Sequence, residues 1–167
     1  MDFSAGIMAL LGTIVGGVLS ILGSVILEYC RQGNKRKNLA FALRGELIAI
    51  RKIIEQRGYK EFLRKGLRAL EEGYERDIPI LSARYEYFQC YKDNVANLGM
   101  LNADTAAAVT QSYTYARAFL EDVSGGLRLN LSNEEKQRFW KELLEILELA
   151  DEKAKCAIRL IEQDFRC

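Results

Sequence analysis

The residue types that most often carry out catalysis are sparse in this chain. None of its 167 residues is histidine, which removes the commonest general base, the commonest metal ligand and the side chain that titrates near neutral pH. Without histidine, neither a Cys–His nor a Ser–His nucleophilic pair can form. The four cysteines lack the CxxC spacing of metal and redox sites, and we interpret them as reduced thiols that face a cytosol. They are Cys30, Cys90, Cys156 and Cys167.

Adjacent acidic residues are the remaining source of acid–base chemistry. Neighbouring side chains on a helix point about 100° apart, so such pairs do not converge on one substrate atom. The sequence also has no Walker loop and no dinucleotide-binding fingerprint. We therefore predict a non-enzymatic protein with no catalytic residue, no cofactor and no metal ligand. The acidic pairs are Glu71-Glu72, Glu121-Asp122 and Glu134-Glu135.

The N-terminal run from Phe3 to Leu27 contains no charged residue over 25 positions. As a helix rising about 1.5 Å per residue, such a run spans a hydrocarbon core of roughly 30 Å with some tilt. A signal peptide would begin with basic residues and end at an A-x-A-like cleavage site, and this run has neither. We predict a transmembrane anchor over residues 1–30.

A basic cluster follows this run directly and is expected to contact lipid headgroups. It consists of Arg31, Lys35, Arg36 and Lys37, and no Lys or Arg precedes the run. The positive-inside rule then places the N-terminus outside and the remaining residues in the cytoplasm. Cys30 lies at this cytoplasmic membrane edge, where acylation and a plain interfacial thiol are both open.

Small residues recur every four positions on one face of the predicted span. Gly12, Gly16, Ser20 and Ser24 form the row, and Gly23 lies beside it. Small-xxx-small faces let two helix backbones approach closely in lipid, which favours self-association. The alternative is that glycine is simply frequent in membrane helices.

Residues 31–167 predict a cytoplasmic bundle of about four helices, so the fold class is all-α. Apolar residues recur at steps of three and four, and no strand pattern competes. Gly58 leaves open whether the first pattern is one bent helix or two. Gly99 is placed to cap the second helix, and Ser132 with Glu135 fits a capping box at the start of the fourth. The last helix is longer than the bundle needs, so we expect its end to project or to pack on a partner. The patterns cover about 38–73, 82–98, 102–124 and 132–165.

Charge is distributed unevenly along this bundle. Residues 28–68 carry a net charge of +8 and residues 69–167 a net charge of −6, which suggests a surface or partner of opposite sign. Anionic lipid fits better than nucleic acid, because the apolar run already indicates a membrane. The basic positions of the first helical pattern are either a solvated face or a surface on anionic lipid. They are Arg44, Arg51, Lys52, Arg57, Lys60, Arg64 and Lys65.

The block "KDNVANLGMLNADTAAAVTQSYTYARAFLEDV", preceded by Pro79 and Tyr91, resembles a group of uncharacterised bacterial membrane-anchored helical proteins. Such proteins have one N-terminal span, a basic segment and a helix like "LAFALRGELIAIRKII" before this block. Asn94, Leu98, Gly99 and Tyr113 occupy the positions of the group's pattern, whereas Met100 departs from its commoner Leu. The resemblance implies a bacterial inner membrane and transfers no activity.

A helical hairpin around Gly99 is the expected partner surface. Tyr91, Asn94, Gly99 and Tyr113 are its candidate contact residues, although Asn94 as a backbone cap and the tyrosines as core are the plainer interpretations. The function predicted is a membrane-anchored interaction module that self-associates or binds a cytosolic protein. The alternative is a membrane-perturbing effector, for example in anti-phage defence, whose transmembrane helices oligomerise.

Overall fold

The computed structural model describes residues 3–76, 85–124 and 131–165, and the side chains of residues 3–15 and of Tyr85 fall outside the description. All secondary structure in these ranges is helical, which confirms the all-α prediction. The chain divides into two compact units, Met1–Asn38 and Leu39–Cys167. The elements are α1 (Phe3–Gln56), α2 (Tyr59–Glu71), the 3₁₀ helix η1 (Tyr85–Phe88), α3 (Gln89–Asn94), the 3₁₀ helix η2 (Val95–Met100), α4 (Ala103–Ser124) and α5 (Asn133–Asp164).

The first helical pattern forms two helices because Gly58 interrupts it. Gly58 has φ +61° and ψ +27°, in the left-handed region that glycine enters at little cost. Its amide donates to the Glu55 carbonyl at 3.0 Å, which closes the end of α1, and its own carbonyl accepts the Phe62 amide at 2.9 Å, which opens α2. The chain therefore turns between α1 and α2 within two residues. This turn at Gly58 is called the elbow below.

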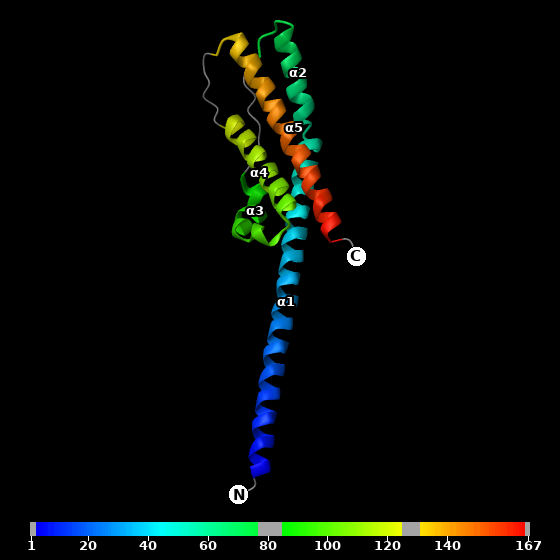
Figure 1. Cartoon of the computed structure of the whole chain (residues 1–167). Helices are drawn as coiled ribbons and strands as arrows, with labels where there is room; N and C mark the ends of the chain where they lie inside the picture. The colour runs from blue at the N-terminus through cyan, green and yellow to red at the C-terminus, as the bar shows by residue number, and fades with distance from the viewer. Residues whose placement is uncertain (1–2, 77–84, 125–130, 166–167) are drawn as a thin grey trace. The chain divides into compact units, whose positions relative to one another are not determined.

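The second unit, Leu39–Cys167, is a helical bundle organised around α5. Figure 1 shows α5 between α2 and α4, and α5 packs along both of them. One half of the core joins the last part of α1 to the first half of α4 and the second half of α5; it includes Leu43, Leu47, Val109 and Ile161. The other half joins α2 to the remaining halves of α4 and α5; it includes Leu63, Leu120, Trp140 and Leu143. The elbow thus lets two consecutive helices cover two successive parts of the same α4–α5 pair.

The segment before α4 differs from its prediction. A single helix over 82–98 was expected, but the described part consists of η1, the six-residue α3 and η2. Two pairs of inward residues, Phe88 with Tyr91 and Leu98 with Leu101, are spaced by three, and a 3₁₀ turn accommodates this spacing as well as an α-helical turn does. The predicted cap at Gly99 is also wrong, because Gly99 lies within η2. The beginning of the predicted helix, with Pro79, lies outside the described residues.

The predictions for the last two helices are largely confirmed. α4 runs from Ala103 to Ser124. α5 starts with the predicted capping box, in which the Glu135 amide donates to Ser132 Oγ at 3.3 Å and the Ser132 amide donates to Glu135 Oε2 at 2.8 Å. The end of α5 does not project from the bundle, so this part of the expectation is wrong, whereas its packing on a partner stays a prediction. Ile161 is fully buried in the bundle, and Asp164 accepts hydrogen bonds from Thr105 at 2.9 Å and from Asn102 at 2.6 Å.

In the first unit, Met1–Asn38, the described residues belong to the single helix α1. Every residue from Gly16 to Lys35 is exposed. Among the residues that the structure describes, no helix combines the length and apolar character needed to cross a membrane.

Candidate functional site

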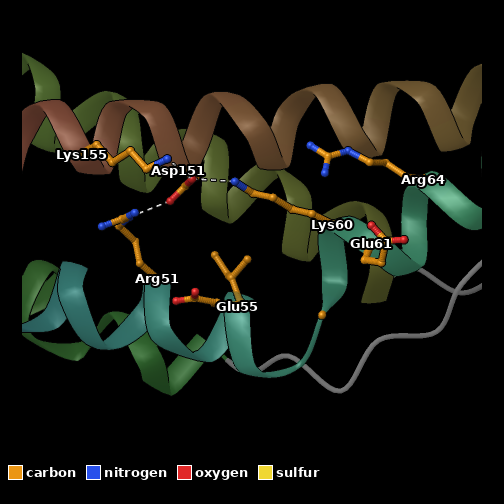
Figure 2. A pocket seen from close by; sticks show the side chains of 9 residues that line it. Arg51, Glu55, Lys60, Glu61, Arg64, Asp151 and Lys155 are labelled. Carbon is orange, nitrogen blue, oxygen red and sulfur yellow. Dashed lines mark hydrogen bonds and ion pairs between the residues drawn. The ribbon is translucent and has the colours of Figure 1, made fainter.

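A pocket of about 310 Å³ lies at the elbow of the second unit (Figure 2). α1 contributes Arg51 and Glu55, α2 contributes Lys60, and α5 contributes Asp151 and Lys155. The remaining lining residues are Ile54, Gly58, Glu61 and Arg64. Seven of the nine lining residues are charged, so the pocket is suited to binding a polar or ionic group.

Asp151 is the centre of this pocket and is only 8% exposed. Three cations from three helices surround it. Arg51 Nε donates to Asp151 Oδ1 at 2.6 Å, while the ammonium groups of Lys60 and Lys155 lie 2.5 and 3.0 Å from Oδ2. Burial opposes ionisation of Asp151 and is the largest single influence on it, but the three hydrogen bonds together outweigh burial. The pKa of Asp151 therefore lies well below its usual range, and this carboxylate stays charged.

The elbow is what brings Arg51 and Lys60 to one carboxylate. The two residues are nine positions apart, which in an unbroken helix would place them on opposite faces and about 13.5 Å apart along the axis. The turn at Gly58 re-aims α2 so that both side chains reach Asp151. The site therefore depends on two features of the fold, the break at Gly58 and the packing of α5 against both helices.

The other charged groups of the pocket are less buried. Arg64 donates to Glu148 at 2.6 Å, and Glu61 lies 3.7 Å from the ammonium group of Lys65 on the same helix. The side chains of Glu55 and Glu61 are exposed at the rim. Arg51 and Lys60 are therefore the half-buried cations of the pocket, whereas Arg64, Lys155 and the two glutamates are exposed.

Part of the predicted basic face belongs to this network. The structure pairs four of its cations with acidic residues of α5, which neither interpretation predicted, although Arg64 remains exposed. The pairs are Arg44–Glu162, Arg51–Asp151, Lys60–Asp151 and Arg64–Glu148. Sequence reasoning missed the site because these partners lie 84 to 118 residues apart. One signal was present, since Asp151 follows Leu147 by four positions and therefore falls on the apolar face of α5.

The predicted hairpin residues come together only in part. The rings of Tyr91 and Tyr113 stack with centroids 4.0 Å apart and an interplanar angle of 14°, and Phe88 meets Tyr113 edge-on at 5.6 Å. Asn94 donates its side-chain amide to the Cys90 carbonyl at 2.9 Å, so it acts as a backbone cap. Gly99 is exposed in η2 and does not belong to this cluster. A second pocket, of about 460 Å³, opens over the stacked tyrosines between α3 and α4.

Glu46 of α1 holds this segment in place, and the sequence did not single it out. Its carboxylate accepts the amides of Cys90 and Tyr91 at 2.6 and 3.0 Å and the hydroxyl of Tyr113 at 2.5 Å. Burial first, and then the hydrogen bond to Glu46, raises the pKa of Tyr113 above its usual value. Tyr113 consequently stays protonated and donates to Glu46.

The predicted membrane-helix residues show an open face where the structure describes them. No heavy atom from elsewhere lies within 4 Å of a Cβ built on Gly16 or Gly23, and the hydroxyl of Ser24 donates to the Ser20 carbonyl at 2.9 Å. The surroundings of Gly12 lie outside the described residues. In the basic cluster, Arg31, Lys35 and Lys37 are exposed and Arg36 is half-buried; Cys30 is exposed as well.

Neither described pocket contains a Ser or Cys nucleophile. No group of three or more His, Cys, Asp or Glu side chains is placed to hold a metal ion in the described parts of the chain. The arrangement at the elbow is suited to electrostatic binding, and the one over the tyrosines to apolar contact. Comparison with known proteins gives no match, whether with protein-family models, curated proteins or solved structures.

Proposed function

We propose that this protein is a non-enzymatic, membrane-anchored helical module whose second unit binds a cytosolic protein partner. The observation that carries the proposal is a set of closely spaced, exposed apolar side chains on α1. Between residues 18 and 27, seven large apolar side chains are each 51% to 72% exposed: Val18, Leu19, Ile21, Leu22, Val25, Ile26 and Leu27.

Lipid explains this exposure better than a single protein partner. At about 100° per residue, Val18, Leu19, Ile21 and Leu27 point in four well-separated directions around the helix. A partner helix covers one stripe, whereas lipid covers the whole circumference. Removing seven such side chains from water is worth on the order of 10 kcal/mol, which is comparable with the stability of a whole domain.

The sequence gives the span its length and direction. The charge-free run Phe3–Leu27 begins in the part of α1 whose side chains lie outside the description, and it supplies the roughly 20 apolar residues that a crossing needs. The basic cluster Arg31–Lys37 follows, which favours an external N-terminus and an internal second unit. We place the protein in a bacterial inner membrane, in line with the resemblance of its central block.

The surface over Tyr91 and Tyr113 is the part of the second unit that we assign to a protein partner. Its pocket is large enough to receive one or two side chains and is lined partly by aromatic rings, which are enriched at interface hot spots. Val95 lines it as well and is 50% exposed. Tyr113 itself is only 2% exposed, so Val95 and the partly buried Phe88 and Tyr91 supply the apolar area whose burial would drive the association.

The anchor is tested by extraction of membranes with alkaline carbonate. The full-length chain is expected to stay in the membrane pellet. Replacing Val18 and Ile21 by arginine should release it, because each arginine near the middle of a span costs roughly 2.5–3.5 kcal/mol on insertion scales. Leu149→Arg, at a 38% exposed position of α5, is the control and should remain in the pellet. Recovery of the parent chain in the carbonate supernatant would rule out the anchor.

A second candidate function, a membrane-perturbing effector, is favoured by the open small-residue face of α1. Gly16 and Gly23 leave space for a second helix, and Ser24 is bonded within its own helix, so this face packs closely without an unpaired hydroxyl. Expression of the full chain in bacteria should then depolarise the membrane, and a Gly12→Leu/Gly16→Leu variant should not. Equal depolarisation by both chains would exclude packing through this face.

A further inference from the structure

The charges at the elbow do not balance on the floor of the pocket. Asp151 is one anion, and Arg51, Lys60 and Lys155 are three cations within 3.0 Å of its oxygens. The side chains of Arg51 and Lys60 are only 32% and 25% exposed, whereas that of Lys155 is 58% exposed. The half-buried part of the pocket thus holds two cations and one anion, and an excess positive charge in such a place is costly unless a further anion compensates it.

The two carboxylates at the rim provide little of that compensation. Glu55 and Glu61 are exposed, as Lys155 is, and the high effective dielectric constant of water weakens their interaction with the half-buried cations. The nine lining residues together comprise four cations and three anions, so the pocket as a whole carries a small excess of positive charge.

Hydrogen-bond donors remain for a ligand at this place. Arg51 uses its Nε for Asp151, which leaves its two terminal NH₂ groups, and each lysine ammonium has three protons of which Asp151 takes one. The first residues of the 13-residue helix α2 line the pocket, so the positive end of the helix lies there. No side chain caps this end at Gly58. Tetrahedral oxyanions match such a set of donors.

We propose that the elbow pocket binds a compact phosphate-bearing anion. The volume of about 310 Å³ is at the lower end of the range for ligand sites, which favours one or two phosphate groups over a large organic ligand. The anion lies between Arg51, Lys60 and Lys155 and so links α1, α2 and α5 across Gly58. This inference goes beyond the proposed function and does not depend on the membrane anchor.

Calorimetric titration of the full-length chain with pyrophosphate, in a non-ionic detergent, tests the site. The reference is a chloride titration matched in ionic strength. Lys60→Gln should weaken pyrophosphate binding by about tenfold or more, since one charge-assisted hydrogen bond is lost. Lys141→Gln, at a 67% exposed lysine of α5 outside the pocket, is the matched control and should bind like the parent.

Asp151→Asn gives the sharper test because its expected effect has the opposite sign. Removing the buried carboxylate leaves three cations facing the pocket, so pyrophosphate should bind about tenfold more tightly than to the parent, or better. Binding that the chloride reference reproduces, or that Lys60→Gln and Lys141→Gln weaken equally, would overturn the proposal. Weaker binding to a folded Asp151→Asn chain would also overturn it.

The source of the phosphate group is settled with lipid nanodiscs. Pyrophosphate is titrated into the chain in discs of phosphatidylcholine alone and in discs that also contain phosphatidylglycerol. An affinity that falls in the anionic discs for the parent and not for Lys60→Gln identifies a lipid headgroup at the site. Equal affinity in both kinds of disc identifies a soluble anion.

Discussion

Among the glycines that the structure describes in the bundle, Gly66 should be the least replaceable, although it lies in the interior of a helix where alanine normally stabilises. It is buried in the middle of α2, and the indole ring of Trp140 lies against its backbone. A Cβ on Gly66 would lie 1.9 Å from Cζ3 and 2.3 Å from Cη2 of that ring, far inside van der Waals contact. Trp140 is 2% exposed and packs against Phe62 with ring centroids 5.6 Å apart, so it has little room to withdraw.

The expected change in the free energy of unfolding is the sum of two opposing effects. Alanine in place of a helix-interior glycine gains about 0.5–1 kcal/mol from backbone entropy. Forcing a methyl group into a filled core costs about 1–3 kcal/mol, and the depth of this overlap puts the cost at the upper end. Gly66→Ala should therefore lower the free energy of unfolding by about 2 kcal/mol, which corresponds to about 8 °C in the melting temperature for a unit of this size.

Gly45→Ala is the matched control. Gly45 lies in the interior of α1, and no heavy atom lies within 4 Å of its built Cβ. This variant should gain about 0.5–1 kcal/mol and melt a few degrees above the parent. Thermal unfolding of the full-length chain is followed by far-ultraviolet circular dichroism, and the emission of Trp140, the sole tryptophan, reports on the same core.

A double-mutant cycle with Trp140→Phe identifies the cause. A smaller ring should remove most of the cost of Gly66→Ala, giving a coupling of about 1 kcal/mol or more. If Gly66→Ala melted at or above the parent temperature, or if its cost were unchanged in the Trp140→Phe background, the close packing of the indole on this glycine would be refuted.

Three further predictions concern charge and capping. Asp151→Asn should destabilise by about 2 kcal/mol, because it leaves three cations without their carboxylate. Since the folded pKa of Asp151 is depressed, its contribution should be constant from about pH 8 to about pH 5 and should fall progressively below about pH 4; an undiminished difference between parent and variant at about pH 2 would contradict this. Glu46→Gln should raise amide exchange of Cys90 and Tyr91 by about tenfold or more in hydrogen-exchange mass spectrometry, and unchanged rates would show that other contacts hold the segment. Ser132→Ala should cost about 1 kcal/mol in chemical unfolding through loss of the cap, and a neutral result would mean that the first turn of α5 is stabilised otherwise.

Helix ends that are marked by local residues could be predicted from the sequence. The capping box at the start of α5 joins Ser132 to a residue three positions later. Gly58 marks the break between α1 and α2, and a pair of glycines follows Ser124, where α4 ends. The segment 85–100 could not be predicted, because both α and 3₁₀ geometry fit its apolar spacing over such short runs. In the structure, the amides of this segment bond to Glu46 of another helix, and no local sequence pattern indicates these contacts.

Ion pairs between residues far apart in the sequence could not be predicted either. The opposite charges of residues 28–68 and 69–167 were evident and were assigned to an external partner. Part of this charge is instead paired internally, between the first two helices and α5. Such pairs stabilise weakly when exposed, so their energetic significance rests on Asp151, the one buried member of these four pairs.

Asp151 pairs with both Arg51 and Lys60 only because of the backbone conformation of Gly58. In one bent helix the nine-residue spacing would keep the two cations on opposite faces, and only one of them could reach α5. The left-handed Gly58 ends α1 and starts α2 within two residues, and both cations then converge on one carboxylate. The sequence shows the interruption at Gly58 but leaves open whether one bent helix or two helices form. The site could therefore not be predicted, because Arg51 and Lys60 meet at Asp151 only when two helices form.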